Sequence, residues 1–190
     1  MHGLVFVQLQ HYVKEKFGDV AWKDVLKVAE INPHRIYVML QSYPDEEIEK
    51  LISSAGSKFA ISREVLLEDF GKYMGNYLIR TYQVMIDSSW KTLEFLENTE
   101  SCIHQVIKSS GSLALPPELI CKRISADEVL IVYSSPRKMC ALAKGIIQSV
   151  ADHYKQNVNI SHPTCMIRDG ASHCEMYVRI YESKFIRNII

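Results

Sequence analysis

The spacing of apolar residues changes near Leu115-Pro116-Pro117, and this change limits the fold more than any other feature. Before these residues, apolar side chains recur every three or four positions, as they do on one face of an α-helix. After them, short β-rich segments stand on either side of another helical stretch. The strands are expected at 119–124, 129–133, 157–160 and 175–181, and the helix at 137–154. A helical first half followed by strand–strand–helix–strand–strand predicts an α+β fold.

One domain is predicted over residues 1–181, in which a helical N-terminal subdomain packs on a C-terminal subdomain with a four-stranded antiparallel sheet and a helix. The chain of 190 residues is long enough for one ordinary domain. The helical part is expected over 1–110 and the mixed part over 111–181, with 182–190 as a short C-terminal tail. The seam near residue 111 lacks the composition of a flexible linker.

The charges of the chain balance, with 22 basic and 22 acidic residues. Zero net charge argues against a protein that binds nucleic acid mainly through the phosphate groups of the nucleic acid. No apolar stretch approaches the roughly 18–20 residues that span a bilayer, and the N-terminus lacks the basic start and cleavage site of a signal peptide. We therefore expect a cytoplasmic protein with no nucleic-acid or membrane partner, whose five cysteines stay reduced.

Catalytic motifs do not stand out in the sequence. It has no Gly-rich phosphate loop, and outside a C-terminal Cys/His cluster no serine or cysteine nucleophile stands beside a plausible histidine base. The chain is predicted not to be an enzyme.

One histidine and one short motif are the first candidates for a binding site. His104 lies in an apolar helical stretch, where a histidine is more often a satisfied core or surface residue than a ligand. The motif ends a strand, and on an extended segment Tyr133, Ser135 and Arg137 share a face, offering two hydroxyls and a guanidinium to carboxylates. The alternative is an ordinary strand–turn–helix junction, with Ser135 as a cap and Arg137 as a solvated charge. Pro117 adds a rigid Pro-Pro step between them.

Taken together, these features resemble the haem-nitric oxide/oxygen binding (H-NOX) family. The resemblance covers essentially the whole chain and rests on Met1-His2-Gly3, Tyr43-Pro44-Asp45, Phe70-Gly71-Lys72, His104, Pro116-Pro117 and the Tyr-x-Ser-x-Arg motif at 133–137. It implies haem b between the two subdomains, with His104 as the axial iron ligand. It also implies that Tyr133, Ser135 and Arg137 hold the haem propionates and that Pro117 distorts the porphyrin.

The resemblance also bears on which gas is bound. It implies a distal pocket formed by Val5, Leu9, Met74, Leu78 and Leu142, none of which offers a strong hydrogen-bond donor. Oxygen-binding relatives have a tyrosine at the position of Leu142. The sequence therefore predicts a sensor that binds nitric oxide and carbon monoxide and holds oxygen poorly. Tyr73 and Tyr77 are near in sequence, and their orientation could upset this prediction.

The same resemblance implies how the signal leaves the domain. Nitric oxide is expected to weaken the iron–His104 bond and to let the haem flatten against Pro117, which would shift one half of the domain against the other. The expected partner is a histidine kinase or a cyclic-di-GMP enzyme, as for related bacterial proteins.

Cysteines and histidines gather near the C-terminus. A hairpin at 168–171 can bring Cys165 and Cys174 together, and tetrahedral zinc readily takes such a Cys₃His set. The alternative is three small, inert buried cysteines. A bacterial subset of H-NOX proteins has a matching zinc cluster, which implies Cys140, His162, Cys165 and Cys174 as ligands, with His173 as the competing histidine. Such a cluster gives the alternative function, a thiol/zinc redox sensor. Cys102 and Cys121 have no assigned role.

Overall fold

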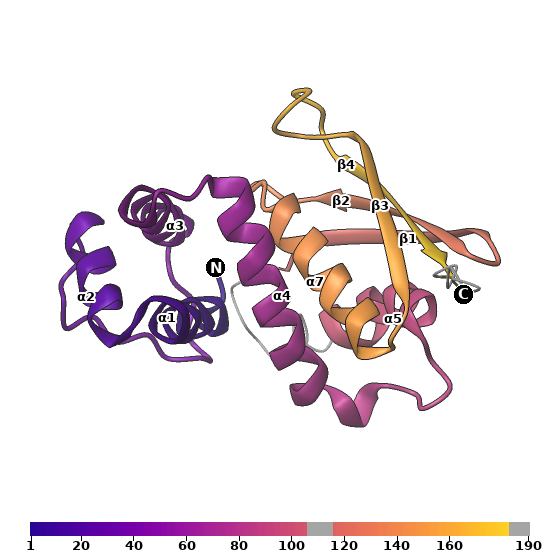
Figure 1. Ribbon diagram of the computed structural model, residues 1–190, viewed down its shortest axis with the longest axis horizontal. Helices are drawn as coiled ribbons and strands as arrows, with labels where there is room; N and C mark the ends of the chain where they lie inside the picture. Colours follow the sequence, from indigo (N-terminus) through magenta and orange to yellow (C-terminus); the bar gives the residue numbers. More distant parts are fainter. Residues whose placement is uncertain (106–115, 183–190) are drawn as a thin grey trace, which may run out of the picture.

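The computed structural model describes residues 1–105 and 116–182. Three helices lie at one end of the molecule, the sheet lies at the other, and two long helices cross between them (Figure 1). The elements are α1 (Gly3–Phe17), α2 (Asp19–Val28), α3 (Asp45–Phe59), α4 (Arg63–Thr81), η1 (Gln83–Met85), α5 (Thr92–Asn98), η2 (Thr99–His104), β1 (Glu118–Ser125), β2 (Glu128–Ser134), α7 (Cys140–His153), β3 (Asn157–Thr164) and β4 (Cys174–Tyr181). The predicted α+β class is confirmed. The predicted subdomain boundary at 110/111 and most of the tail at 182–190 lie outside the described residues.

Capping side chains mark where two of the helices, α1 and α4, begin. His2 caps α1, because its Nδ1 accepts a hydrogen bond from the backbone N–H of Leu4 at 3.2 Å. Ser62 caps α4 in the same way, accepting from the N–H of Val65 at 3.3 Å. Each cap satisfies one of the backbone donors that a helix start leaves free. The apolar stripe of α1 then packs into the core of the helical end.

The sheet has the order β1-β2-β4-β3, and every neighbouring pair is antiparallel. The predicted four-stranded antiparallel sheet is thus confirmed, and α7 connects β2 to β3 across it. Alternate residues of β2 and β4 are buried, so one face of the sheet forms a second core. Register places Tyr133 opposite Leu119 on one side and Cys174 on the other.

The helical end and the sheet end meet where α4 crosses α7. Two glycines make this crossing tight: a Cβ on Gly145 would overlap the carbonyl oxygen of Glu68, and a Cβ on Gly71 would overlap that of Leu142. The backbones of the two helices therefore touch, with no room for a side chain between them. This crossing fixes α7 against the helical end.

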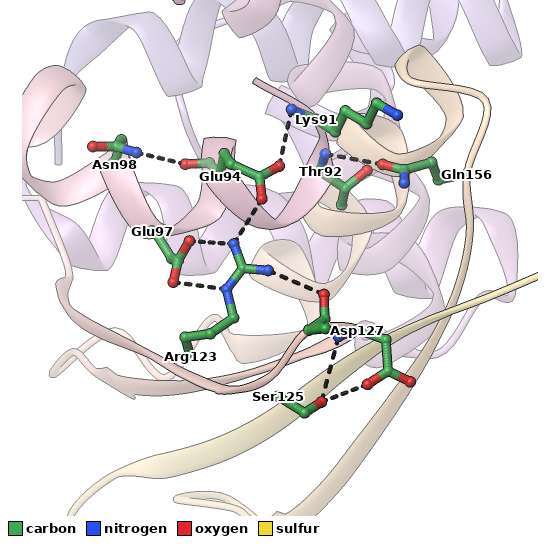
Figure 2. Close-up of polar contacts among 10 residues, drawn as sticks. Lys91, Thr92, Glu94, Glu97, Asn98, Arg123, Ser125, Asp127 and Gln156 are labelled. Atoms are coloured by element: carbon green, nitrogen blue, oxygen red, sulfur yellow. Dashed lines mark hydrogen bonds and ion pairs between the residues drawn. The ribbon is translucent and has the colours of Figure 1, made fainter. Parts of the chain in front are cut away.

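Helix α5 is tied to the sheet by an ionic cluster around Arg123 of β1 (Figure 2). The guanidinium donates to Glu94 at 2.7 Å and to both carboxylate oxygens of Glu97 at 2.5 and 3.0 Å. At its start, the N–H of Thr92 donates to Gln156 at 3.0 Å. The helix that leads into η2 is thus held at both ends. In the described part of the chain, no helix is long and apolar enough to cross a membrane.

Candidate functional site

His104 is the last residue of η2, a π-helical turn that continues α5. Such wide turns are rare and occur often at functional sites. The imidazole Nδ1 lies 2.8 Å from a carboxylate oxygen of Glu100, one turn earlier, and the His104 side chain is 12% exposed. The ring is therefore held in place, and it borders two adjoining pockets between the helical end and the sheet end.

The larger of these pockets encloses about 920 Å³ of unfilled space, including its open mouth. Its lining is mainly apolar, with polar groups at one edge. The described residues around it are Met1, His2, Leu4, Val5, Met74, Leu78, Tyr82, His104, Pro116, Pro117, Tyr133, Ser135, Arg137, Met139, Leu142, Ala143 and Ile146. A flat apolar cofactor with charged groups on one edge fits such a lining.

The polar edge contains all three residues of the motif at the end of β2. The hydroxyl of Tyr133 accepts from the N–H of Met139 at 3.2 Å, and Ser135 Oγ accepts from the N–H of Arg137 at 3.3 Å. Ser135 thus makes a local turn and lines the pocket, but it is not the helix cap that the sequence offered as an alternative, because α7 begins at Cys140 after Met139. Burial raises the pKa of Tyr133, so its hydroxyl stays protonated and able to donate.

Arg137 is not a solvated charge, since its side chain is only 11% exposed and its Nε lies 3.0 Å from Asp45. Burial alone would raise the pKa of the Asp45 carboxyl, but hydrogen bonds from the amino group of Met1 and from Arg137 outweigh it, and the pKa is lowered. Asp45 therefore stays charged and orients the guanidinium at the pocket edge. Sequence reasoning gave Asp45 no such role, because the pair spans 92 residues of chain and depends on the fold.

Four of the five expected distal-pocket residues line the pocket: Val5, Met74, Leu78 and Leu142. Leu9 is not among the described residues that line it; its side chain is fully buried in the core of the helical end. The reason is that the pocket meets only the first turn of α1, and Leu9 lies one turn farther along.

The structure shows which tyrosines face the pocket, a question that the sequence left open. The Tyr77 hydroxyl contacts Met39 at 3.7 Å, and Tyr73 packs against Tyr12, so neither lines the pocket. Tyr82, at the end of α4, does line it and was missed. Its spacing from Met74 and Leu78, eight and four residues, is the helical periodicity that could have identified it.

A second group of side chains lies at the start of α7. The ligand atoms of Cys140, His162, Cys165 and Cys174 all lie within 4.8 Å of one another, and Cys140 Sγ is 4.0 Å from Cys165 Sγ. They come from α7, β3, the hairpin after it and β4. The competing His173 is on the surface, bonded to Ser172. The structure thus brings together the four residues that the resemblance implied.

The surroundings of this cluster suit a metal ion. His162 Nε2 is buried and has no hydrogen-bond partner among the described residues, which is costly unless something binds it. Burial and the nearby Lys144 and Arg168 lower the pKa of His162, so the ring is neutral and can coordinate. Burial raises the pKa of Cys174, although the N–H of Met166 donates to its Sγ at 3.3 Å and acts in the opposite direction. These features fit tetrahedral zinc.

Protonation of the thiols differs within the cluster. Burial and the neighbouring cysteines raise the pKa of Cys140 to about 12. Burial acts in the same direction on Cys165, but the backbone N–H groups of Arg168 and Ile167 outweigh it and lower its pKa. The first thiolate to form is therefore that of Cys165.

Comparison with known proteins places the chain in a family. The family model described as Haem-NO-binding matches residues 2–162. Soluble guanylate cyclases 89Da and 89Db of Drosophila melanogaster are 24% and 23% identical over 142 residues. The match covers 72% of this chain and 20% of each cyclase, so the chain spans about a fifth of the length of these curated relatives.

Solved structures share the fold. An H-NOX protein from S. oneidensis in the Fe(II)NO state superposes with a TM-score of 0.88 at 24% identity, covering 96% of this chain and all of that one. An unliganded Fe(II) H-NOX protein from K. algicida gives 0.86 at 18% identity, covering 98% and 100%. With the family model, the fold and the pocket in agreement, the chain belongs to the Haem-NO-binding (H-NOX) family of haem-based gas sensors.

Proposed function

We propose that this protein is a nitric oxide sensor that holds haem b in the pocket between its two ends. The observation that carries the proposal is that His104 and the Tyr133, Ser135 and Arg137 set line one pocket, whose remaining walls are mainly apolar. A histidine suits haem iron, and a buried arginine with two hydroxyls suits a pair of carboxylates. Pro117 lies in the same lining, where it can press on a flat cofactor.

Each residue then has a physical task. Haem bound there would be held by His104 and would supply an iron able to take up a diatomic gas. Arg137, held by Asp45, and the hydroxyls of Tyr133 and Ser135 offset the desolvation of two propionates. His104 ends a helical segment anchored at Arg123, so a change in its bond to the iron would act on the position of η2 against the sheet.

The gas preference follows from the donors in the pocket. Bound oxygen gains negative charge and needs a hydrogen bond, whereas nitric oxide and carbon monoxide bind without one. Val5, Met74, Leu78 and Leu142 are apolar, whereas Tyr82 of the same lining carries a hydroxyl. Since the position of Leu142 is apolar, we propose that the protein binds nitric oxide and carbon monoxide and holds oxygen poorly. Similar H-NOX structures contain nitric oxide in one case and carbon monoxide in another, which supports the proposal.

We propose that this domain is a cytoplasmic sensor with no catalysis of its own, which controls a partner signalling protein. A histidine kinase or a cyclic-di-GMP enzyme is the expected partner. The fly relatives are guanylate cyclases, of which this chain covers 20%, so a cyclase is a further candidate output.

The test is a visible spectrum of the ferrous protein, purified with haem available, alone and with nitric oxide, carbon monoxide or air. We expect a Soret band that changes with nitric oxide and carbon monoxide and not lastingly with air. His104→Ala should abolish the histidine-ligated spectrum. A protein that takes up no haem would overturn the proposal.

A second function is favoured by the cluster of Cys140, His162, Cys165 and Cys174, which we propose to hold zinc. Cys140, His162 and Cys165 border a pocket that also contains Arg63, Lys138 and Arg168. The same pocket contains Glu49 and Glu64, and it opens to solvent, which gives an oxidant access to the cysteines. Oxidation of two cysteines to a disulfide, with two electrons passing to the oxidant and release of the metal, is therefore the candidate signal.

Two measurements separate this function from gas sensing. Metal analysis should find about one zinc per chain, and none after Cys174→Ala. A thiol-driven response of the partner to peroxide should survive His104→Ala, whereas a response to nitric oxide should not. If peroxide acts only through haem, the redox function is wrong.

A further inference from the structure

A carboxylate contacts the ring that the proposed function assigns to iron. Glu100 Oε2 lies 2.8 Å from His104 Nδ1, and both residues belong to η2. The His104 side chain is 12% exposed and that of Glu100 is 31% exposed, so solvent shields the pair only in part. The histidine is therefore the partner of a charged acceptor as well as a pocket residue.

Three acidic residues, each three positions after the last, lie along this helical segment and contact different partners. Glu94 and Glu97 both pair with Arg123 of β1 (Figure 2). The third, Glu100, contacts the His104 ring. The backbone of Glu100 is also fixed, because its carbonyl accepts from the N–H of Gln105 in the wide turn. The carboxylate is thus presented to His104 from an anchored base.

We propose that Glu100 is a positioning residue that sets the strength of the iron–His104 bond, an inference that rests on the haem function proposed above. With the Nδ1 proton directed to the carboxylate, the nitrogen that coordinates iron is Nε2. A carboxylate acceptor shifts electron density onto the imidazole and makes it a stronger iron ligand. Nitric oxide must then act against a stronger bond, so Glu100 raises the level of nitric oxide at which His104 is released.

The experiment uses the haem-loaded protein and the variant Glu100→Gln, which keeps the size of the side chain and removes its charge. Three signals are measured: the iron–histidine stretching frequency by resonance Raman, the midpoint potential, and the five-coordinate share of the nitric oxide complex. We expect a lower frequency, a larger five-coordinate share and a potential raised by about 59 mV. That shift corresponds to a tenfold change in the relative affinity for ferric and ferrous iron, the low end for an outer-shell partner.

Two further variants make the result specific. Glu182→Gln removes the same charge at an exposed position outside both the His104 contact and the Arg123 cluster, and should leave all three signals unchanged. Glu100→Asp keeps the charge on a shorter side chain and should give values between those of Glu100→Gln and the unaltered protein. If Glu100→Gln matches the unaltered protein while histidine still ligates iron, this inference falls and the gas-sensing function stands. If iron in the unaltered protein has no histidine ligand, both fall.

Discussion

His162 and His173 present opposite environments only eleven positions apart. His162 Nε2 is buried within the cluster of Cys140, His162, Cys165 and Cys174, whereas His173 is 40% exposed and hydrogen-bonded to Ser172. Their roles should therefore separate cleanly by substitution, although both are histidines beside a cysteine-bearing segment.

We expect His162→Ala to weaken zinc binding by more than the roughly 10–100-fold loss that follows from mutating an outer-shell partner. His173→Ala is the matched control and should bind zinc as the unaltered protein does. Zinc affinity is measured by competition with a chromophoric chelator. Equal loss in both variants would contradict the assignment of His162.

Leu142 decides the proposed discrimination against oxygen. Leu142→Tyr places a hydroxyl in the lining, and one hydrogen bond to a charged group contributes about 1.5–3 kcal/mol. Oxygen should then dissociate roughly tenfold to a hundredfold more slowly, as measured by stopped-flow spectroscopy. Tyr82→Phe tests the hydroxyl already in the lining and should leave oxygen binding weak. Lasting oxygen binding that Tyr82→Phe abolishes would show that Tyr82, and not Leu142, governs the choice.

Among the elements, the α4–α7 crossing and the α5–β1 anchor fix the proposed gas pocket from two sides. The first depends on glycines whose absent side chains let backbones touch. The second depends on one arginine between two acids. The α4–α7 crossing depends on space and the α5–β1 anchor on charge. The stability lost on substitution should therefore depend on pH only at the anchor.

Gly145→Ala should destabilise the protein by at least the 1–3 kcal/mol typical of overpacking, because the new methyl group overlaps the Glu68 carbonyl. The free energy of unfolding is measured in urea. Asp152→Ala, at an exposed position near the end of the same helix, should change it by no more than about 0.5 kcal/mol. A Gly145→Ala variant as stable as the unaltered protein would mean that the helices are farther apart than described.

Arg123→Ala should lower stability at neutral pH by about 1 kcal/mol, the upper range for a partly exposed ion pair. Burial alone would raise the pKa of Glu94, but the hydrogen bond from Arg123 outweighs it and the pKa is lowered in the folded state. A lowered pKa stabilises the fold above the ordinary value near 4.5, and that gain disappears as the pH falls through the folded-state value. The difference between Arg123→Ala and the unaltered protein should therefore shrink below about pH 4.

The control for this comparison is Arg179→Ala, which removes a more exposed arginine of the same sheet. We expect a smaller loss, within about 0.5 kcal/mol. A pH-independent difference for Arg123→Ala would contradict an ionic origin.

At the scale of the whole molecule, the proposed haem joins the helical end to the sheet end. A ligand that binds only the folded state adds about 2.7 kcal/mol at a concentration 100 times its dissociation constant. Haem-loaded protein should therefore have a clearly higher Tm than haem-free protein by calorimetry, and His104→Ala should reduce the gain. His34→Ala, at an exposed loop position, should not. Equal Tm values with and without haem would contradict a haem site between the helical end and the sheet end.

Sequence alone predicts the elements well and the contacts between distant residues poorly. Helix starts at His2 and Ser62 and the alternation of β2 are local, so the chain itself reveals them. The Asp45–Arg137 pair and the overlap of Gly145 with Glu68 depend on how whole elements pack, which periodicity does not encode. Glu100 is the exception: its position four residues before His104 is a helical neighbour spacing, and it was overlooked.

The two proposed cofactor sites also differ in the length of chain that each must close. The Cys/His cluster draws all its residues from 140 to 174, from α7, β3, the hairpin after it and β4. The pocket at His104 needs α1 and α4 as well as β2 and α7. Short closures cost less chain entropy than long ones. The shorter closure favours assembly of the zinc site before the haem pocket when the whole chain refolds, so we expect protein refolded without zinc to retain less haem than protein refolded with it.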